Sequence, residues 1–309
     1  MEDQRVTDAL VLVASHLEPI YKELPPPYLE ICALLGNEVV KGYQHYVEMY
    51  PSFEAHPESL SEIIILLGAR QFFKDKKQVG LNHYRRIFSL NPEEPNDQNY
   101  TQDFRTRYSA ANTQSNFLNN YVSSVVIPKP MKLNSSVYEH FIVSHPPLEH
   151  ALDVACSAFN ESVKDVFGVI DSKSDLKNTQ HLYPWNMWIG NPEFYDEWVT
   201  LLFPVLKALD EISDSLPTEG YQFRWSGFIS ERLFTVFIIH CRNTNRWNFV
   251  ERPVIFFEDS VIAERDSVIA ERDETELDLE SLLKSRSWKS TRFLRVGDQV
   301  LKRLFLSSR

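Results

Sequence analysis

Glycine is scarce in this sequence, and its scarcity excludes two common kinds of nucleotide site. Only nine glycines occur in 309 residues, and none are spaced as G-x-G-x-x-G or as a Walker A loop. Both loops need glycine because the backbone must approach a phosphate closely. A dinucleotide-binding Rossmann site and a P-loop are therefore disfavoured.

Cysteine, positive charge and long apolar runs are also in short supply. The three cysteines, Cys32, Cys156 and Cys241, lie far apart, which predicts reduced thiols in a cytosolic protein rather than disulfides or a zinc site. A net charge of -11 argues against a general nucleic-acid binder. The N-terminal segment lacks the basic start of a signal peptide, and no apolar run is long enough to span a bilayer. We expect a cytoplasmic protein, bound at most to the inner face of the plasma membrane.

Several catalytic and metal-binding motifs are missing as well. The sequence contains no HExxH, no CxxC pair and no G-x-S-x-G, so zincin, zinc-finger and α/β-hydrolase chemistry lack support. The acidic triplets within 276–280 are only loosely similar to a D-x-D motif and fall in a predicted exposed helix. No metal-ligating residues are therefore predicted, although Mg²⁺ or Mn²⁺ stays open as a cofactor.

The apolar patterns predict strands that alternate with helices, which favours an α/β layer fold. The predicted strands are 9–14, 78–82, 122–127 and 182–189. The predicted helices are 28–46, 59–73, 136–159 with a break at Pro146-Pro147, 192–212 and 228–240, the last of which could also be another kind of buried element.

Composition changes near residue 258, where three segments can be distinguished. An α/β domain is predicted over 1–257. Residues 258–283 are acidic and contain SVIAERD twice in succession, which predicts a solvated helix or a short coiled coil. Residues 284–309 form a basic amphipathic tail, which suggests an anionic membrane surface or a partner enzyme.

The stretch KQVGLNHYRRIF places four polar side chains directly behind a short apolar strand. They are His83, Tyr84, Arg85 and Arg86. Two arginines beside a histidine and a tyrosine can neutralise a diphosphate through charge-assisted hydrogen bonds. The same arginines can equally pair with nearby carboxylates as a structural feature.

The segment YPWNMWIGNPEFYDEW, residues 183–198, is rich in tryptophan. Trp185, Asn186, Met187 and Trp188 are candidates for a flat aromatic platform that contacts a sugar. Most tryptophan-rich segments are core, so packing is the competing interpretation.

A third segment, FRWSGFISERLF, combines Arg224, Trp225, Glu231 and Arg232 around a permissive Ser-Gly pair. Glu231 is a candidate general base if it faces a cleft. Otherwise it is a carboxylate near a helix N-terminus, where the helix dipole favours it.

In this order, the three segments resemble a family of bacterial glycosyltransferase-type domains from capsule and O-antigen (lipopolysaccharide) biosynthesis. The resemblance covers roughly residues 9–240. Its most specific pieces are H-Y-R-R at 83–86 and S-E-R-L at 230–233. Ser15-His16, Ser61-Glu62, 125–130 and 186–198 match the remaining parts of the pattern.

The resemblance implies a GT-A-like, Rossmann-type α/β domain with a mixed central sheet. It implies transfer of galactofuranose or another hexose from a nucleotide sugar, such as a UDP-sugar, to a glycan or lipid-linked glycan. Ser15 and His16 would lie near the nucleotide, together with His83, Tyr84, Arg85 and Arg86. Arg85 and Arg86 would stabilise the diphosphate, and Glu231 would act as the base of an inverting displacement. The sugar or acceptor would meet the side chains of Trp185, Asn186, Met187, Trp188, Arg224, Trp225 and Arg232.

Two departures from the family pattern support a rival hypothesis. The lysine usual after the first histidine is Leu17, and an aromatic-rich helix is replaced by Ile63 to Arg70. A non-catalytic carbohydrate-binding or scaffolding domain on the same fold would accommodate both departures.

Overall fold

The computed structural model describes residues 8–15, 28–32, 62–73, 75–83, 86–89, 92–93, 98–100, 121 and 123–257. All of them belong to the first of the two units into which the chain divides, Met1–Glu258, and the second unit is Asp259–Arg309. The predicted acidic helix and basic tail lie outside the described residues, and both stay predictions.

A mixed β-sheet of nine strands forms one layer of the described part of the chain. Its main run has the order β2-β1-β3-β9-β6-β10, in which the short strand β9 is antiparallel to both of its neighbours. These strands are β1 (Ala9–Ser15), β2 (Tyr28–Cys32), β3 (Gln78–His83), β6 (Val125–Pro128), β9 (Trp188–Gly190) and β10 (Phe249–Arg252). Beyond the end of β3 the sheet continues through β4 (Arg86–Phe88), β11 (Val254–Phe257) and β5 (Gln98–Tyr100).

Strand β3 is buried along its whole length, and so are residues 11–14 of the apolar strand β1, as expected for strands in the middle of a sheet. Leu12 of β1 lies opposite Leu81 of β3 in a parallel register, and both side chains belong to the main core. One of the few glycines, Gly80, lies where β3 passes β9. A Cβ atom at this position would lie 2.7 Å from the carbonyl oxygen of Trp188, so only glycine fits without a shift of the backbone.

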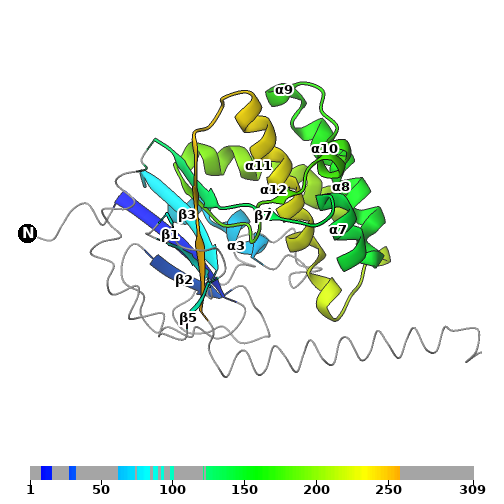
Figure 1. The fold of residues 1–309 in the computed structure, drawn as a ribbon, viewed down its shortest axis with the longest axis horizontal. Helices are drawn as coiled ribbons and strands as arrows, with labels where there is room; N and C mark the ends of the chain where they lie inside the picture. Colours follow the sequence, from blue (N-terminus) through cyan, green and yellow to red (C-terminus); the bar gives the residue numbers. More distant parts are fainter. Residues whose placement is uncertain are drawn as a thin grey trace, which may run out of the picture. The chain divides into compact units, whose positions relative to one another are not determined.

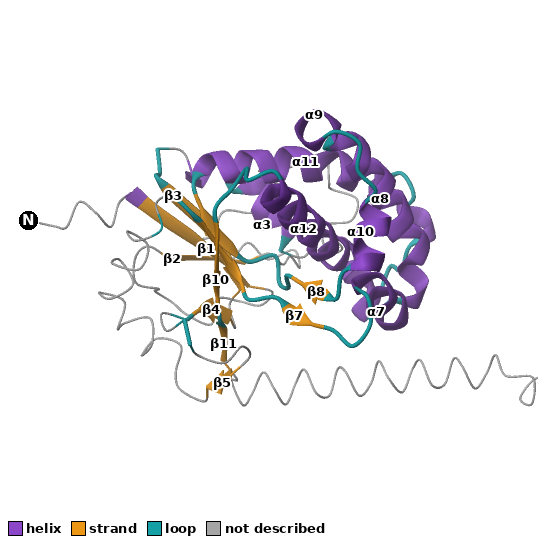
Figure 2. Cartoon of the chain, turned by 45° about the horizontal axis from the view of Figure 1, so that its top comes forward, coloured by secondary structure: helices purple, strands orange, loops and turns teal. Residues whose placement is uncertain are grey.

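Helices form the second layer, on one side of the sheet, in the views of Figures 1 and 2. They are α3 (Ile63–Gly68), α4 (Arg70–Phe73), α7 (Val137–Ser144), α8 (Glu149–Ser162), α9 (Lys164–Phe167), α10 (Ser172–Asn178), α11 (Pro192–Asp210) and α12 (Trp225–Asn243). Short 3-10 turns are η3 (Pro146–Leu148), η4 (Ser213–Ser215) and η5 (Tyr221–Arg224), and the small strands β7 (Met131–Lys132) and β8 (His181–Leu182) pair with each other. No helix in these ranges is long and apolar enough to cross a membrane.

Local sequence explains where several helices begin. Ser136 and Glu139 form a capping box at α7, with both reciprocal hydrogen bonds at 3.1 Å. Asn191 caps α11 and is followed by Pro192 at the first helical position, where a missing N–H costs nothing. The Asp171 side chain caps α10.

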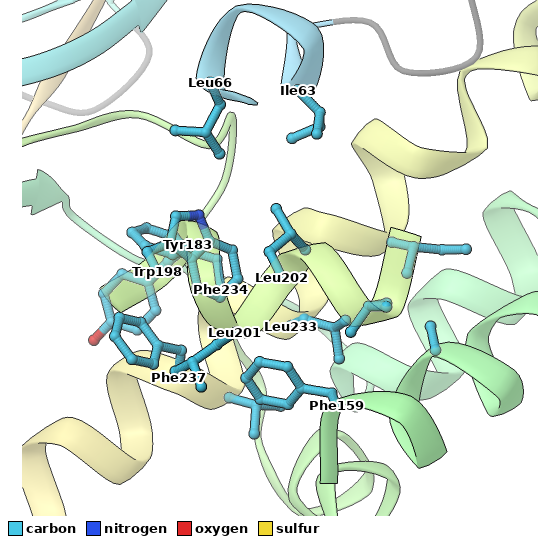
Figure 3. Close-up of a cluster of buried hydrophobic side chains, with 14 of the residues drawn as sticks. Ile63, Leu66, Phe159, Tyr183, Trp198, Leu201, Leu202, Leu233, Phe234 and Phe237 are labelled. Atoms are coloured by element: carbon cyan, nitrogen blue, oxygen red, sulfur yellow. The ribbon is translucent and has the colours of Figure 1, made fainter. Parts of the chain in front are cut away.

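The core lies between the sheet and the helices, and α12 runs through it with most of its side chains buried. Figure 3 shows part of this cluster, in which Trp198, Phe234 and Phe237 pack close together. A helix buried on several sides has to be apolar on several sides, which explains the FTVFII stretch that follows Glu231 and Arg232.

The strands at 9–15 and 78–83, the helix at 192–210 and the break after Ser144 confirm the sequence predictions. Two other predictions were wrong. Residues 28–32, predicted as the start of a helix, form strand β2, because they pair in parallel with β1. The strand predicted over 182–189 is interrupted, because Trp185 and Asn186 have φ of 71° and 50° and turn the chain between β8 and β9.

The predicted helix at 59–73 is divided into α3 and α4, with Ala69 between them. Ser59 and Ser61, which lie at the start of this predicted helix, are outside the described residues. Glu62 precedes α3, and its side chain caps no backbone N–H there, which leaves its carboxylate to contact more distant groups.

Candidate functional site

Four segments that are far apart in the sequence meet near the carboxyl end of β3. They are the residue before α3, the first residue of β4, the turn before β9 and the first turns of α12. Leu81 pairs with Trp188 in an antiparallel register, so the turn that precedes Trp188 lies beside the end of β3. This end of a sheet is where open α/β folds place their ligands.

Asn186 is the central connection among these segments. Its Nδ2 atom donates to Glu62 Oε1 at 2.9 Å and to the Gly227 carbonyl oxygen at 3.3 Å. Its Oδ1 atom accepts from the Ser230 hydroxyl at 3.1 Å. All four residues are buried, and asparagine tolerates the left-handed backbone that this position requires.

The Glu231 carboxylate lies beside this network, on the first part of α12. Its Oε1 atom accepts from the Trp185 backbone N–H at 3.0 Å, and its Oε2 atom accepts from Arg232 Nη1 at 2.8 Å. Its side chain keeps 15% of its surface exposed. Burial raises the pKa of Glu231, Arg232 opposes this shift, and the nearby Glu62 carboxylate adds to it. The result is a partly accessible carboxylate that holds a proton more readily than an ordinary glutamate.

Arg232 is the counter-ion of Glu231 and is itself enclosed. Its side chain is only 4% exposed, and its Nη1 also donates to the Phe228 carbonyl oxygen at 3.2 Å. The guanidinium lies 5.2 Å from the centre of the Phe141 ring, and burial lowers its pKa. Such a side chain offers almost no surface to a sugar or acceptor, which Arg232 was predicted to contact. In this structure Arg232 is instead the ion-pair partner of Glu231.

Arg86 contributes a second positive charge, held between two aromatic rings. Its guanidinium lies 5.0 Å from the Trp185 ring centre and 5.1 Å from that of Phe256. Stacking of this kind fixes the plane of an arginine and is favourable by about 0.5–2 kcal/mol. The charge of Arg86 also acts on Glu231, whose pKa it lowers slightly, so the two side chains lie within electrostatic reach of each other.

Arg224, at the end of η5, completes the charged group. Its Nη2 atom lies 3.5 Å from Glu62 Oε2, and its guanidinium lies 5.8 Å from the Phe228 ring centre. Its side chain is 37% exposed, whereas that of Glu62 is 6% exposed. The site therefore combines the partly exposed Arg224 with the enclosed carboxylate of Glu62 and the partly accessible carboxylate of Glu231.

The structure divides the predicted aromatic platform into a surface part and a core part. Trp185 is half-buried at the site. Met187 and Trp188 are 0% exposed and Trp225 is 3% exposed. The Trp188 ring packs against Phe194 at 5.2 Å and Tyr195 at 6.2 Å. For Met187, Trp188 and Trp225 the packing interpretation holds in this structure, because a fully enclosed side chain presents no face to a sugar.

The remaining predicted residues fall at or beyond the edge of the described chain. His83 ends β3 and is buried, and Ser15 ends the neighbouring strand β1. His16, Tyr84 and Arg85 lie outside the described residues, so their predicted contacts with the nucleotide stay predictions.

Sequence reasoning gave no role to Glu62, Ser230, Tyr221 or His145, although all four belong to this region. Glu62 and Ser230 were noted only as parts of the S-E and S-E-R-L motifs. Within the described ranges, no group of three histidine, cysteine, aspartate or glutamate side chains is placed to hold a metal ion.

Comparison with known proteins agrees with a glycosyltransferase-like α/β fold. A solved apo structure of WbbM, a bifunctional glycosyltransferase, is similar to this chain with a TM-score of 0.58 and 16% sequence identity. The similarity covers 82% of this chain but 46% of that structure, so the chain spans less than half of WbbM's length.

The chain belongs to the DUF4422 family, a domain of unknown function, whose model matches residues 68–243. This match includes β3, the turn before β9 and all of α12, and thus most of the site. No curated protein matches the sequence.

Proposed function

We propose that this chain is a nucleotide-sugar-dependent glycosyltransferase of the GT-A-like type, with Glu231 as its base. The observation that carries the proposal is the position of Glu231. A partly exposed carboxylate with a raised pKa lies beside Trp185, whose ring holds the guanidinium of Arg86. One group that accepts a proton and one that attracts an anion therefore meet at the strand ends of a fold similar to a glycosyltransferase.

The chemistry assigns one step to each group. The acceptor hydroxyl loses its proton to Glu231 as its oxygen bonds to the anomeric carbon of the donor sugar. The bond between that carbon and the nucleoside diphosphate breaks at the same time, and the electron pair leaves with the diphosphate. Attack from the opposite side inverts the anomeric configuration. Arg86, together with Arg85, stabilises the charge on the leaving group through bidentate hydrogen bonds.

The finer parts of the proposal come from the sequence resemblance. The donor is a UDP-sugar that carries galactofuranose or another hexose, and the acceptor is a glycan or lipid-linked glycan of a growing cell-surface polysaccharide. Trp185 and Arg224 are the partly exposed side chains best placed to contact these substrates, since Trp185 borders Glu231 and Arg224 borders Glu62. Asn186 supports the turn that carries Trp185.

The experiment is a transfer assay with UDP-hexoses, UDP-galactofuranose included, and glycan acceptors, run on the wild-type chain and on Glu231→Gln. Glutamine keeps an acceptor for the Trp185 N–H but cannot take up the proton. We expect turnover to fall by about 10²–10⁴. The matched control is Glu193→Gln, an exposed glutamate on α11, which should leave turnover unchanged.

A folded Glu231→Gln variant with near wild-type turnover would show that Glu231 is not the base. Thermal unfolding with and without UDP-sugars tests the wider proposal, because a ligand that binds only the native state raises its stability. Stabilisation without transfer to any acceptor would favour the non-catalytic carbohydrate-binding domain instead.

A further inference from the structure

An exposed tyrosine lies at the edge of the site and takes no part in the chemistry proposed above. Tyr221 is the first residue of η5, the short turn that leads directly into α12. It is 52% exposed, an unusual state for a large aromatic side chain and one shared by few large hydrophobic residues in the described chain.

Two buried rings support Tyr221 from below. The Phe228 ring centre lies 4.9 Å from that of Tyr221, and the His145 ring is stacked on Phe228 at 4.2 Å with an angle of 20° between the planes. His145 Nδ1 lies 2.8 Å from Gln222 Oε1, and Gln222 Nε2 donates to the Ser144 carbonyl oxygen at 3.1 Å. Tyr221 is therefore held as the outer ring of a fixed aromatic group.

This aromatic group lies close to Glu231. Phe228 precedes Glu231 by three residues on α12, which is a separation of about 4.5 Å along the helix axis. Arg224 lies over the Phe228 ring, and Arg232 bonds to the Phe228 carbonyl oxygen. The charges of Arg224, Glu231, Arg232 and Arg86 all act on the Tyr221 phenol, so Tyr221 lies within electrostatic reach of the reacting groups.

The chemistry of this surface favours a neutral, ring-shaped ligand over an anion. Burial lowers the pKa of His145 to about 4, so its ring is uncharged near pH 7. The electron-rich face of an aromatic ring attracts weakly positive C–H groups, and a pyranose ring carries such C–H groups on one face and hydroxyls around its edge. The Gln222 amide beside Tyr221 is a suitable partner for such hydroxyls.

We propose that the outer face of Tyr221, with Gln222 beside it, is the subsite that binds the sugar ring of the acceptor. The proposal rests on the proposed function, since Arg86 is assigned there to the donor diphosphate and Glu231 to the acceptor hydroxyl. An acceptor ring stacked on Tyr221 would present a hydroxyl towards Glu231, one helical turn away from Phe228. Tyr221 is thus a binding residue and not a catalytic one.

Binding is tested first without any donor, by saturation-transfer NMR with methyl hexopyranosides as the probes. We expect saturation transfer to the C–H protons of the sugar ring in the wild type, in Tyr221→Phe and in Tyr221→Trp, and its loss in Tyr221→Ala. Val169→Ala replaces a 91% exposed valine in the loop between α9 and α10 and should bind like the wild type. Undiminished binding by Tyr221→Ala, with an unchanged unfolding temperature, would overturn the subsite.

The kinetic arm separates this inference from the proposed function. We expect Tyr221→Ala to raise the acceptor KM about tenfold or more, as for an aromatic hot spot, with the donor KM unchanged. A rise in the donor KM instead would assign the ring to the nucleobase and overturn the inference while the transferase stands. Sugar binding that depends on Tyr221 in a chain without transfer to any acceptor would overturn the proposed function but retain a sugar site.

Discussion

Asn186 and Glu62 are joined by a buried hydrogen bond of 2.9 Å, although 124 residues separate them in the sequence. Asn186 also bonds to Gly227 and Ser230, so one amide connects α3, the turn before β9 and α12. The Glu231 carboxylate accepts a hydrogen bond from the backbone N–H of Trp185, the residue that precedes Asn186. The position of the Glu231 carboxylate therefore depends on the buried amide of Asn186.

Replacement of that amide should destabilise the fold. Asn186→Ala would leave the buried Glu62 carboxylate and the Ser230 hydroxyl each short of a partner, so we expect a loss of about 2–3 kcal/mol in the free energy of unfolding. Urea denaturation measures this loss. Asn178→Ala, which removes an exposed amide bonded to Ser174, is the control and should cost less than about 0.5 kcal/mol. Equal losses in the two variants would contradict the role of Asn186.

Arg86 should matter for donor binding through both its charge and its shape. Lysine keeps the charge but loses the flat guanidinium that lies between Trp185 and Phe256. We expect Arg86→Lys to weaken UDP binding about tenfold and Arg86→Ala to weaken it further, as measured by calorimetry. Arg70→Lys, at a side chain that is 79% exposed, should bind UDP like the wild type.

If the arginines act in place of a bound cation, chelation should spare the reaction. Transfer with and without EDTA is expected to proceed at the same rate. Complete loss of transfer on chelation, restored by Mg²⁺ or Mn²⁺, would show that a metal ion and not Arg86 neutralises the leaving diphosphate.

The pH profile of turnover should reflect the raised pKa of Glu231. Because burial makes the folded protein hold this proton more tightly, the carboxylate becomes protonated at a higher pH than an ordinary glutamate, whose pKa is about 4.3. A base works only when deprotonated, so turnover should fall on acidification with a midpoint above that value. A profile flat down to about pH 4 would contradict this assignment, and the residual activity of Glu231→Gln should lack the acidic limb.

His145 should make the fold less stable in mild acid. Its pKa falls from the usual 6.5 to about 4 because it is buried, while Gln222 opposes the shift and Arg232 and His140 add to it. The unfolded chain therefore takes up the proton at a higher pH than the folded chain. The stability that comes from a neutral His145 is fully present above about pH 6.5 and is lost between there and about pH 4.

The variant that tests this is His145→Phe, which keeps a ring against Phe228 but cannot titrate. Its unfolding temperature should vary less with pH between 6.5 and 4 than that of the wild type. His150→Phe replaces an exposed histidine on α8 and should follow the wild type. Burial also lowers the pKa of His140. His140 should therefore account for part of the change of unfolding temperature with pH that remains in His145→Phe.

The sequence correctly predicted the strands and helices that are marked by their own apolar runs or capping residues. Strand β1 is a continuous apolar run, the apolar residues Val79 and Leu81 mark β3, and α11 begins at a capping asparagine followed by proline. Strand β2 was predicted as part of a helix, because five residues that pair with β1 carry no signal of that pairing. The turn at Trp185 was missed because strong apolar residues on both sides resemble one strand.

The site could be predicted in part, and for a similar reason. Glu231 and Arg86 lie in motifs with unusual chemistry, so the sequence marks them. Nothing in the sequence distinguishes the half-buried Trp185 from the enclosed Trp188 three residues later, because only the packing of β9 against β3 separates them. Glu62 acquires its role from contacts with Asn186 in the turn before β9 and with Arg224 at the end of η5, which no local pattern contains.

The hydrogen bond between Glu62 and Asn186 also affects the order in which the parts of the site form during synthesis. At a translation rate of about 5–20 residues per second, roughly 6–25 s pass between the synthesis of these two residues. Through that interval the Asn186 amide that binds the Glu62 carboxylate has not yet been synthesised, and α12 is synthesised later still. Non-local contacts of this kind slow folding. The contacts around Glu231 therefore form late, and a nascent chain that stops before α12 lacks both the site and the strands β10 and β11 of the sheet.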